Sequence, residues 1–422
     1  MSSVGRLLAI LLAAAIATLA LSASSAAVSQ PQALTPVVLF PAFHFTKLEV
    51  TVHNQRSAPG CPRSGSFQDW YQNPHPSNDF SQVCRDELLT LRYDANPRVP
   101  MPRRFSGQRG VTVSFIDYGK TSSAPYYSVL YHTLEKAGYT ADKNIRVAGY
   151  DARLTPDMGG FLPRTRALIE ATYRANGDRP VQLVGHSNGP LYAQYLLTHT
   201  TRAWRHKYVH GFTPIAGNFP GQGSVYSIMF TGLNTEDFSS PQTRAGAVAS
   251  ARMFLSSPAS YMSSADPAVF GRSEVVLVDR ATGVKYTPAD YRRLFTDAHL
   301  PIALQIANYY IGFVKFRDPA HFPDVDVFAE RGSGIKTVVG AVLPNLDVGQ
   351  VVTSKTPLLM RDGDVNQEDT TNTAIRVWKS MRCFRFSLTD HPGVNHFALP
   401  TDPSLLRQLI AAAEHPRSNC PS

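Results

Sequence analysis

The sequence predicts an α/β fold with a doubly wound, mainly parallel sheet, and three observations support this prediction. Short apolar segments alternate with amphipathic helical segments through residues 111–215, which is the order produced when crossover helices join parallel strands. A serine between glycines stands where one strand passes into a helix. Hydrophobic residues make up 43% of the 422 residues, so the chain can bury a large core within one domain.

The individual elements follow from apolar patterning and from stop signals. Residues 36–41 form an apolar run closed by proline, which predicts a buried first strand, and residues 48–52 alternate as a half-buried strand does. Further strands are expected at 111–115, 144–149, 181–184 and 208–215, helices at 126–137 and 161–176, later strands at 335–339 and 357–360, and a closing helix at 404–413.

Two long segments interrupt the α/β pattern. Residues 221–334 are too long for a loop, so we expect a cap or lid inserted over the functional site. Residues 50–105 form an excursion whose central part is rich in Pro, Asn, Asp and Ser. Its aromatic side chains either enter a lipid interface or pack onto the main body; they are Phe67, Trp70, Tyr71 and Phe80.

Residues 1–27 are expected to be a cleaved signal peptide. Arg6 precedes an apolar run at 7–16, and small residues follow through Ala27, as in secretory leaders. A membrane anchor is the alternative, but the apolar run is shorter than the roughly 20 residues of a spanning helix. The mature chain, residues 28–422, is therefore expected to be secreted or lumenal, either extracellular or in a lysosome or vacuole.

The four cysteines, Cys61, Cys84, Cys383 and Cys420, fit an oxidising compartment. Three pairings are possible, of which nearest-neighbour pairing gives two local loops. The cysteine spacing does not suggest zinc, and the sequence has no His-Glu-x-x-His, Gly-x-Gly-x-x-Gly or phosphate loop. We therefore expect neither a metal nor a cofactor.

The formal charge of +9 arises from scattered Lys and Arg residues. Because no basic stripe is interleaved with aromatic residues, nucleic acid is not an expected partner. A modestly basic protein can favour anionic lipid surfaces, although solubility alone explains such a charge equally well.

Residues 185–189 read Gly-His-Ser-Asn-Gly, the only Gly-x-Ser-x-Gly motif of the sequence. A sharp turn from strand to helix strains its central residue and leaves room only for glycine two positions away on either side. Such a turn is typical of α/β-hydrolases and predicts that Ser187 is a nucleophile at the carboxyl edge of the sheet. An ordinary glycine turn with a solvated serine is the alternative.

An activated serine needs a histidine, and a carboxylate to orient that histidine. In α/β-hydrolases the three residues follow the chain order Ser, acid, His. Asp364, just after the strand expected at 357–360, is the preferred acid, with Asp362 and Asp369 as alternatives.

The histidine is expected in the loop before the last helix, where both His391 and His396 lie. Because His391 precedes a proline and is restricted to extended geometry, His396 is preferred. His186 abuts the serine, but its side chain is expected to pack elsewhere. The oxyanion hole would use the backbone N–H of Asn188 and an N–H from the loop that includes Phe43.

Six short motifs share the order of one known family. They are residues 37–42 (Val-Val-Leu-Phe-Pro-Ala), 150–153 (Tyr-Asp-Ala-Arg), 186–189 (His-Ser-Asn-Gly), 203–208 (Ala-Trp-Arg-His-Lys-Tyr), 362–366 (Asp-Gly-Asp-Val-Asn) and 395–399 (Asn-His-Phe-Ala-Leu). In this order the mature chain resembles the lecithin:cholesterol acyltransferase family, which includes lysosomal phospholipase A and plant phospholipid acyltransferases. The sequence departs from the family pattern at Ala42, which replaces a glycine, at Ala152, which replaces a tryptophan, and in an acid motif shorter by two residues.

The resemblance implies a role for each site residue. Ser187 would carry the acyl group, Asp364 would orient His396, His396 would be the base, and Phe43 would supply an oxyanion N–H. The resemblance also implies disulfides that join Cys61 to Cys84 and Cys383 to Cys420, a membrane-binding hairpin at Cys61, and a lid from about residue 221 to 253.

The expected function is therefore that of a serine-dependent O-acyltransferase or phospholipase. It would act as a monomer on a phospholipid membrane or lipoprotein-like surface, and would pass the acyl group to water or to an alcohol such as a sterol. Two alternatives remain: a neutral-lipid lipase or carboxylesterase, and a catalytically inactive homologue that binds lipid.

Overall fold

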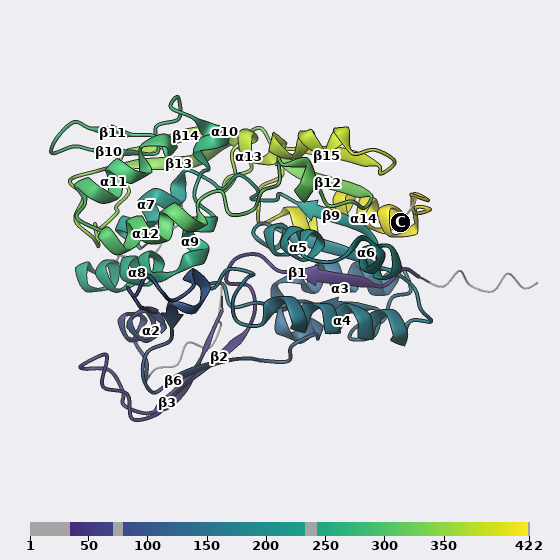
Figure 1. Cartoon of the computed structure of the whole chain (residues 1–422), viewed down its shortest axis with the longest axis horizontal. Helices are drawn as coiled ribbons and strands as arrows, with labels where there is room; N and C mark the ends of the chain where they lie inside the picture. Colours follow the sequence, from purple (N-terminus) through teal and green to yellow (C-terminus); the bar gives the residue numbers. More distant parts are fainter. Residues whose placement is uncertain (1–33, 71–78, 233–242, 421–422) are drawn as a thin grey trace, which may run out of the picture. The chain divides into compact units, whose positions relative to one another are not determined.

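The central element of the fold is a six-stranded sheet in which every neighbouring pair of strands is parallel. The computed structural model describes residues 34–70, 79–232 and 243–420. The expected signal peptide and Tyr71 lie outside these ranges. The strand order is β15-β12-β9-β8-β1-β7 (Figure 1), formed by Phe386–Pro392, Val327–Ser333, Val209–Ile215, Val181–His186, Val37–Phe40 and Ile145–Val147.

Helices cover this sheet, as the α/β pattern predicts. Helix α4 contacts α5 and α6, and helix α3 contacts α14. Their apolar faces bury residues such as Leu168, Ile169 and Leu196 against the strands, which is the main source of stability for an amphipathic helix. The five helices span Ser128–Lys136 (α3), Phe161–Ala175 (α4), Gly189–Thr198 (α5), Arg202–Tyr208 (α6) and Pro403–Glu414 (α14).

The excursion contains a small antiparallel sheet of its own, in the order β3-β2-β6. Strand β6 (Val111–Phe115) was predicted as a strand, but the prediction that it belongs to the parallel sheet is wrong. It pairs antiparallel with β2 (Leu48–Val52), from Leu48 opposite Phe115 to Val52 opposite Val111. Strand β3 (Gly65–Asp69) pairs with the other edge of β2.

A disulfide joins Cys61 to Cys84, so the loop between β2 and helix α2 (Gln82–Leu89) is closed. Phe67 and Phe80 pack together in the core of the excursion, with ring centroids 5.0 Å apart.

The second disulfide joins Cys383 to Cys420. Two further short strands, β4 (Arg92–Tyr93) and β5 (Phe105–Ser106), pair with each other.

A second sheet, in the order β11-β10-β13-β14, accompanies a group of helices and has its own core. The strands expected at 335–339 and 357–360 are present, but they belong to this sheet and are antiparallel to each other. Its strands are Leu277–Asp279 (β10), Lys285–Tyr286 (β11), Ile335–Leu343 (β13) and Leu358–Gly363 (β14), and the helices are Ser224–Thr231 (α7), Arg244–Ser256 (α8), Pro258–Met262 (α9), Pro267–Phe270 (α10), Tyr291–Asp297 (α11) and Pro301–Tyr310 (α12).

Strand β12 was not predicted, because residues 327–333 fall within the range where an insertion was expected. Its sequence, Val-Phe-Ala-Glu-Arg-Gly-Ser, includes charged residues and lacks a continuous apolar run. Strands β9 and β15 nevertheless flank it on both sides. The expected insertion at 221–334 therefore includes one strand of the central sheet.

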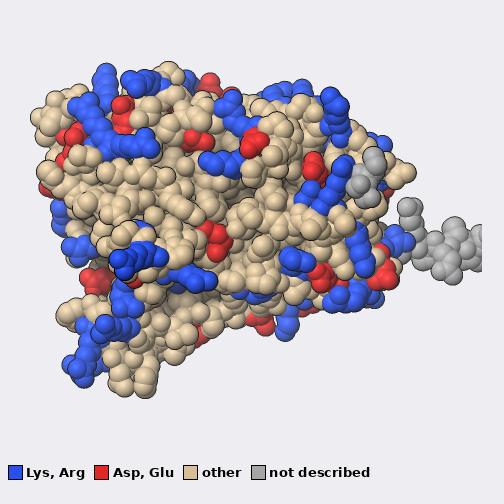
Figure 2. Space-filling model, in the orientation of Figure 1, with Lys and Arg blue, Asp and Glu red and all other residues tan. Residues whose placement is uncertain are grey.

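Charged residues are dispersed over the surface of the protein. On the face drawn in Figure 2, lysines and arginines lie singly or in small groups over the whole surface, with acidic residues among them. Across the ranges that the structure describes, every helix is too short or too polar to cross a bilayer.

Candidate active site

Ser187 occupies the turn between β8 and α5 and has the strained backbone that the motif predicts. Its φ is 61°, in the left-handed region that non-glycine residues rarely adopt. A Cβ on Gly185 would come within 2.8 Å of the Pro190 nitrogen, and one on Gly189 within 2.1 Å of the Phe40 carbonyl oxygen. Glycine is therefore required on both sides of the turn. The Ser187 N–H donates to the Ile215 carbonyl at 3.0 Å, which ties the turn to β9.

Asp364 and His396 come together from two distant loops. Nδ1 of His396 lies 3.3 Å from Oδ2 of Asp364, and the His396 N–H donates to the Asp364 carbonyl at 2.6 Å. Both residues are buried. The Gln367 N–H donates to Oδ1 of Asp364 at 2.9 Å, so the carboxylate is fixed from a second direction.

The alternative acids and the alternative histidine have other partners. Asp362 is exposed and pairs with Lys336 at 2.8 Å. Asp369 lies 3.6 Å from an arginine of β12. His391 is buried with its Nε2 2.7 Å from Glu330, and this hydrogen bond raises the pKa of the imidazole. The structure thus places Asp364, rather than its neighbours, beside His396.

Ser187 and His396 line one cavity of about 210 Å³. The hydrogen bonds among the described residues include none between the Ser187 hydroxyl and the His396 ring; in ligand-free enzymes such contacts often tighten only when substrate binds. The wall is largely apolar, as a site for an acyl chain requires. Its apolar residues are Phe43, Phe45, Val225, Ile228, Phe254 and Phe397.

The two expected oxyanion donors, Phe43 and Asn188, line the same cavity. Asn188 directly precedes helix α5, whose N-terminus favours developing negative charge. Its side chain donates to Ser263 at 2.8 Å and accepts from Asn218 at 2.9 Å. The Phe43 ring stacks on Phe254 of α8, with centroids 6.1 Å apart.

Two residues behind the cavity were missed as functional candidates by the sequence analysis. The Tyr127 hydroxyl lies 3.0 Å from Nδ1 of His186, and Nε2 of His186 lies 3.0 Å from the His396 carbonyl oxygen. Tyr127 also accepts from the Ala42 N–H at 2.8 Å. The His186 side chain is packed, as expected, and its hydrogen bonds connect the serine turn with His396. Tyr127 carries no sequence signal, because a tyrosine near a helix start is ordinary.

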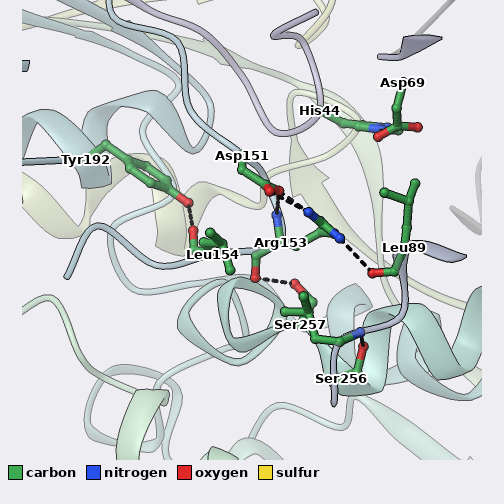
Figure 3. A network of polar contacts seen from close by, with 10 residues as sticks. His44, Asp69, Leu89, Asp151, Arg153, Leu154, Tyr192, Ser256 and Ser257 are labelled. Carbon is green, nitrogen blue, oxygen red and sulfur yellow. Dashed lines mark hydrogen bonds and ion pairs between the residues drawn. The ribbon is translucent and has the colours of Figure 1, made fainter. Parts of the chain in front are cut away.

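Arg153 joins three parts of the chain near the site (Figure 3). Its guanidinium binds Asp151 through Nε at 3.0 Å and through Nη2 at 2.6 Å, and Nη1 donates to the Leu89 carbonyl at the end of α2 at 2.9 Å. Its own carbonyl accepts from the Ser257 hydroxyl at 2.8 Å. The Tyr-Asp-Ala-Arg motif therefore connects the body to the excursion and to the cap.

The expected lipid-contacting residues differ in their surroundings. Phe67 is 3% exposed and belongs to the core of the excursion, so its side chain is not available to a lipid surface. Trp70 is half-buried and directly follows β3.

Within the described part of the chain, no group of three or more His, Cys, Asp or Glu side chains is placed to hold a metal ion.

Comparison with known proteins identifies relatives. The family model of lecithin:cholesterol acyltransferase matches residues 90–336, more than half of the chain. The lysosomal phospholipase A and acyltransferase of Mus musculus is 26% identical over 307 residues, which cover 71% of this chain and 69% of that protein. The phosphatidylcholine-sterol acyltransferase of Homo sapiens is 24% identical over 392 residues, which cover 85% and 84%.

A solved structure, the crystal structure of the Tle4-Tli4 complex, is similar in fold. Its TM-score is 0.50 at 12% sequence identity, and the match covers 90% of this chain and 97% of that chain. Together with the parallel sheet and the strained turn at Ser187, this likeness establishes an α/β-hydrolase fold. The chain belongs to the lecithin:cholesterol acyltransferase family.

Proposed function

We propose that the chain is a serine-dependent lipid O-acyltransferase and phospholipase that uses Ser187, His396 and Asp364. The observation that carries the proposal is the convergence of a strained serine turn and a His–Asp pair on one apolar cavity. The relatives named as phospholipase A and as phosphatidylcholine-sterol acyltransferase support a phospholipid as the acyl donor.

In the first half-reaction, Ser187 Oγ attacks the ester carbonyl carbon of a phospholipid and its proton passes to Nε2 of His396. Asp364, on Nδ1 of the same ring, stabilises the imidazolium that forms. The N–H groups of Phe43 and Asn188 stabilise the negative oxygen of the tetrahedral intermediate. The carbon–oxygen bond to the lysophospholipid then breaks, and the leaving alkoxide takes the proton from His396.

In the second half-reaction, a hydroxyl acceptor gives its proton to His396 and attacks the acyl-enzyme. Water as acceptor gives a fatty acid, and a sterol or another alcohol gives an ester; Ser187 regains its proton in either case. The reaction needs no cofactor, because an ester is exchanged for an ester or an acid without a change in oxidation state.

The substrate is proposed to arrive from a membrane or lipoprotein-like surface. Residues 50–105 would contact this surface and residues 221–334 would cover the cavity. Trp70 is a half-buried aromatic residue within the disulfide-closed loop. We propose a secreted or lumenal location, because the two disulfides require an oxidising compartment.

Product analysis with vesicles of labelled phosphatidylcholine and cholesterol tests this function. We expect lysophosphatidylcholine together with free fatty acid, sterol ester or both, and none of these products with Ser187→Ala. Hydrolysis of soluble short-chain esters that is indifferent to vesicles would instead indicate a carboxylesterase. Full activity of Ser187→Ala would contradict the proposal.

A further inference from the structure

His44 is a titratable side chain on the loop that would supply the oxyanion donor. The loop runs from β1 to β2, and His44 directly follows Phe43 and lines the same cavity as Ser187. Its φ is 65°, a strained conformation for a non-glycine residue that persists only when its surroundings hold it. The contacts of His44 must therefore hold it in this conformation.

Asp69 supplies the contact. Nε2 of His44 lies 2.7 Å from Oδ2 of Asp69, and the two side chains lie next to each other in Figure 3. Asp69 ends β3, and the register of β3 on β2 places it opposite Leu48, close to where the loop enters β2. The antiparallel pairing thus brings the carboxylate back beside the loop from which β2 departs.

Charged groups of both signs surround the pair. Burial opposes the charge on His44, but Asp69 outweighs it and raises the pKa of the imidazole, with smaller contributions from Asp86 and Asp151. Burial likewise opposes the charge on Asp69, but His44 outweighs it and lowers the pKa of the carboxyl, assisted by Arg153 and then by an arginine of α2. The two groups therefore stay oppositely charged over a wider pH range than they would separately.

The other contacts of the loop come from different parts of the chain. The Ala42 N–H donates to Tyr127, which directly precedes α3, and the Phe43 ring stacks on Phe254 of the cap. The His44–Asp69 pair is the contact from the excursion. These three contacts hold the loop at Ala42, Phe43 and His44. An oxyanion donor on this loop has to be held in place before the reaction, with its N–H directed at the substrate oxygen.

We propose that His44 and Asp69 act together as positioning residues for the oxyanion loop, so that β3 of the disulfide-closed excursion sets the geometry of the active site. The proposal rests on the proposed function, since it assumes that the Phe43 N–H stabilises the reaction at Ser187. Neither residue touches the reacting atoms in this account; both act through the backbone of Phe43.

A double-mutant cycle tests the proposal. The variants are Asp69→Leu, His44→Asn and the double variant, with Asp69→Asn as the conservative replacement that keeps a hydrogen-bond acceptor. Asparagine suits position 44 because it tolerates the left-handed backbone but is too short to reproduce the contact. His321→Asn is the matched control, since His321 forms an exposed contact with Asp318 at 3.1 Å.

The readouts are kcat and KM for a soluble nitrophenyl ester, the rate at which a fluorophosphonate labels Ser187, and Tm. We expect kcat and the labelling rate to fall about tenfold or more in both single variants, because removal of one oxyanion donor costs about 10²–10³-fold. KM should change less than about twofold, since the loss occurs in the transition state. Asp69→Asn should recover most of the rate, and the control should match the wild type.

The double variant should be no slower than either single variant, because each residue acts only through its partner. Additive losses, a change in KM alone, or rates within about twofold of wild type in the folded single variants would overturn the proposal. If Asp69→Leu fails to fold, His44→Asn decides the question by itself. The labelling rate requires no lipid, so failure of lipid acyl transfer and failure of the positioning role are seen separately.

Discussion

The Tyr127 hydroxyl lies 3.0 Å from Nδ1 of His186, and this contact continues a chain of hydrogen bonds behind the active site. Because Nε2 of His186 faces the His396 carbonyl, Nε2 must carry the proton and Nδ1 must accept from Tyr127. Burial lowers the pKa of His186 well below its usual value, with a further contribution from His396, so the ring stays neutral. The tyrosine hydroxyl can therefore accept from the Ala42 N–H while it donates to the ring.

Replacing Tyr127 with Phe should lower kcat about tenfold, because a buried N–H of the oxyanion loop and Nδ1 of His186 both lose their partner. Steady-state kinetics on a soluble ester measures this effect. Tyr131→Phe is the matched control: its hydroxyl is also buried and donates to the Ala124 carbonyl at 3.1 Å. It should lose some stability and keep its kcat, and an equal loss of kcat in both variants would argue against a specific role of Tyr127.

Replacing Arg153 with Met should destabilise the fold by about 3–5 kcal/mol, because the buried Asp151 carboxylate would lose its charged partner and keep only the backbone N–H of residue 153. The side chains of both residues are only 10% exposed. Arg153→Lys should restore part of this stability, since one ammonium cannot replace the two-point contact. Urea unfolding measures the difference.

An exposed ion pair provides the control for the Arg153 measurement. Lys120 contacts Asp117 at 3.4 Å and its side chain is 55% exposed, so Lys120→Met should leave the unfolding midpoint unchanged. A midpoint of Arg153→Met equal to that of the wild type would show that the contacts to Asp151 and Leu89 contribute little to stability.

Glu368 gives the stability a pH dependence. Burial, and after it the charge of Glu274, raises the pKa of the Glu368 carboxyl from 4.5 to about 8. Because the folded state prefers the protonated form, this contribution to stability is complete below pH 4.5 and is lost as the pH rises through 8. Glu368→Gln stays neutral, so its Tm should exceed that of the wild type increasingly from pH 5 to pH 9.

The control for Glu368 is an exposed glutamate. Glu135 lies on the solvent side of α3, and the Tm of Glu135→Gln should follow that of the wild type at every pH. Thermal unfolding at several pH values measures all three proteins. A constant Tm difference between Glu368→Gln and the wild type across this range would show that the carboxyl does not titrate as described.

Gly189→Ala should abolish reaction at the serine, because a Cβ there would lie 2.1 Å from the Phe40 carbonyl oxygen and would displace the turn. The rate of fluorophosphonate labelling measures the effect. Gly107→Ala is the control, since its Cβ would meet only an ordinary contact at 3.6 Å. Normal labelling of Gly189→Ala would mean that the turn tolerates a side chain at this position.

Local patterns were sufficient to predict the strands around Ser187 and the turn itself. Apolar runs identified β1 and β8, and the spacing of the glycines predicted a strained backbone at Ser187, which the structure shows as a φ of 61°. The chain order of serine, acid and histidine, the strand before Asp364 and the proline after His391 favoured Asp364 and His396 over their alternatives. The structure places these two side chains 3.3 Å apart.

Sheet membership was not predictable in the same way, because it depends on pairing between distant segments. Strand β6 looks like any half-buried strand, yet it pairs with β2 and not with the central sheet. The contacts of His44 with Asp69 and of Tyr127 with His186 depend on register and on chain crossings. No single segment of the sequence carries that information.

The most direct test of the account is the detection of an acyl group on Ser187. Rapid quenching of the enzyme with dipalmitoylphosphatidylcholine vesicles, followed by mass spectrometry of the peptide that contains Ser187, should show a palmitoyl adduct in the wild type and none in Ser187→Ala. His396→Ala should form the adduct far more slowly. Turnover of the lipid with no adduct on Ser187, or with the adduct on another residue, would contradict the account.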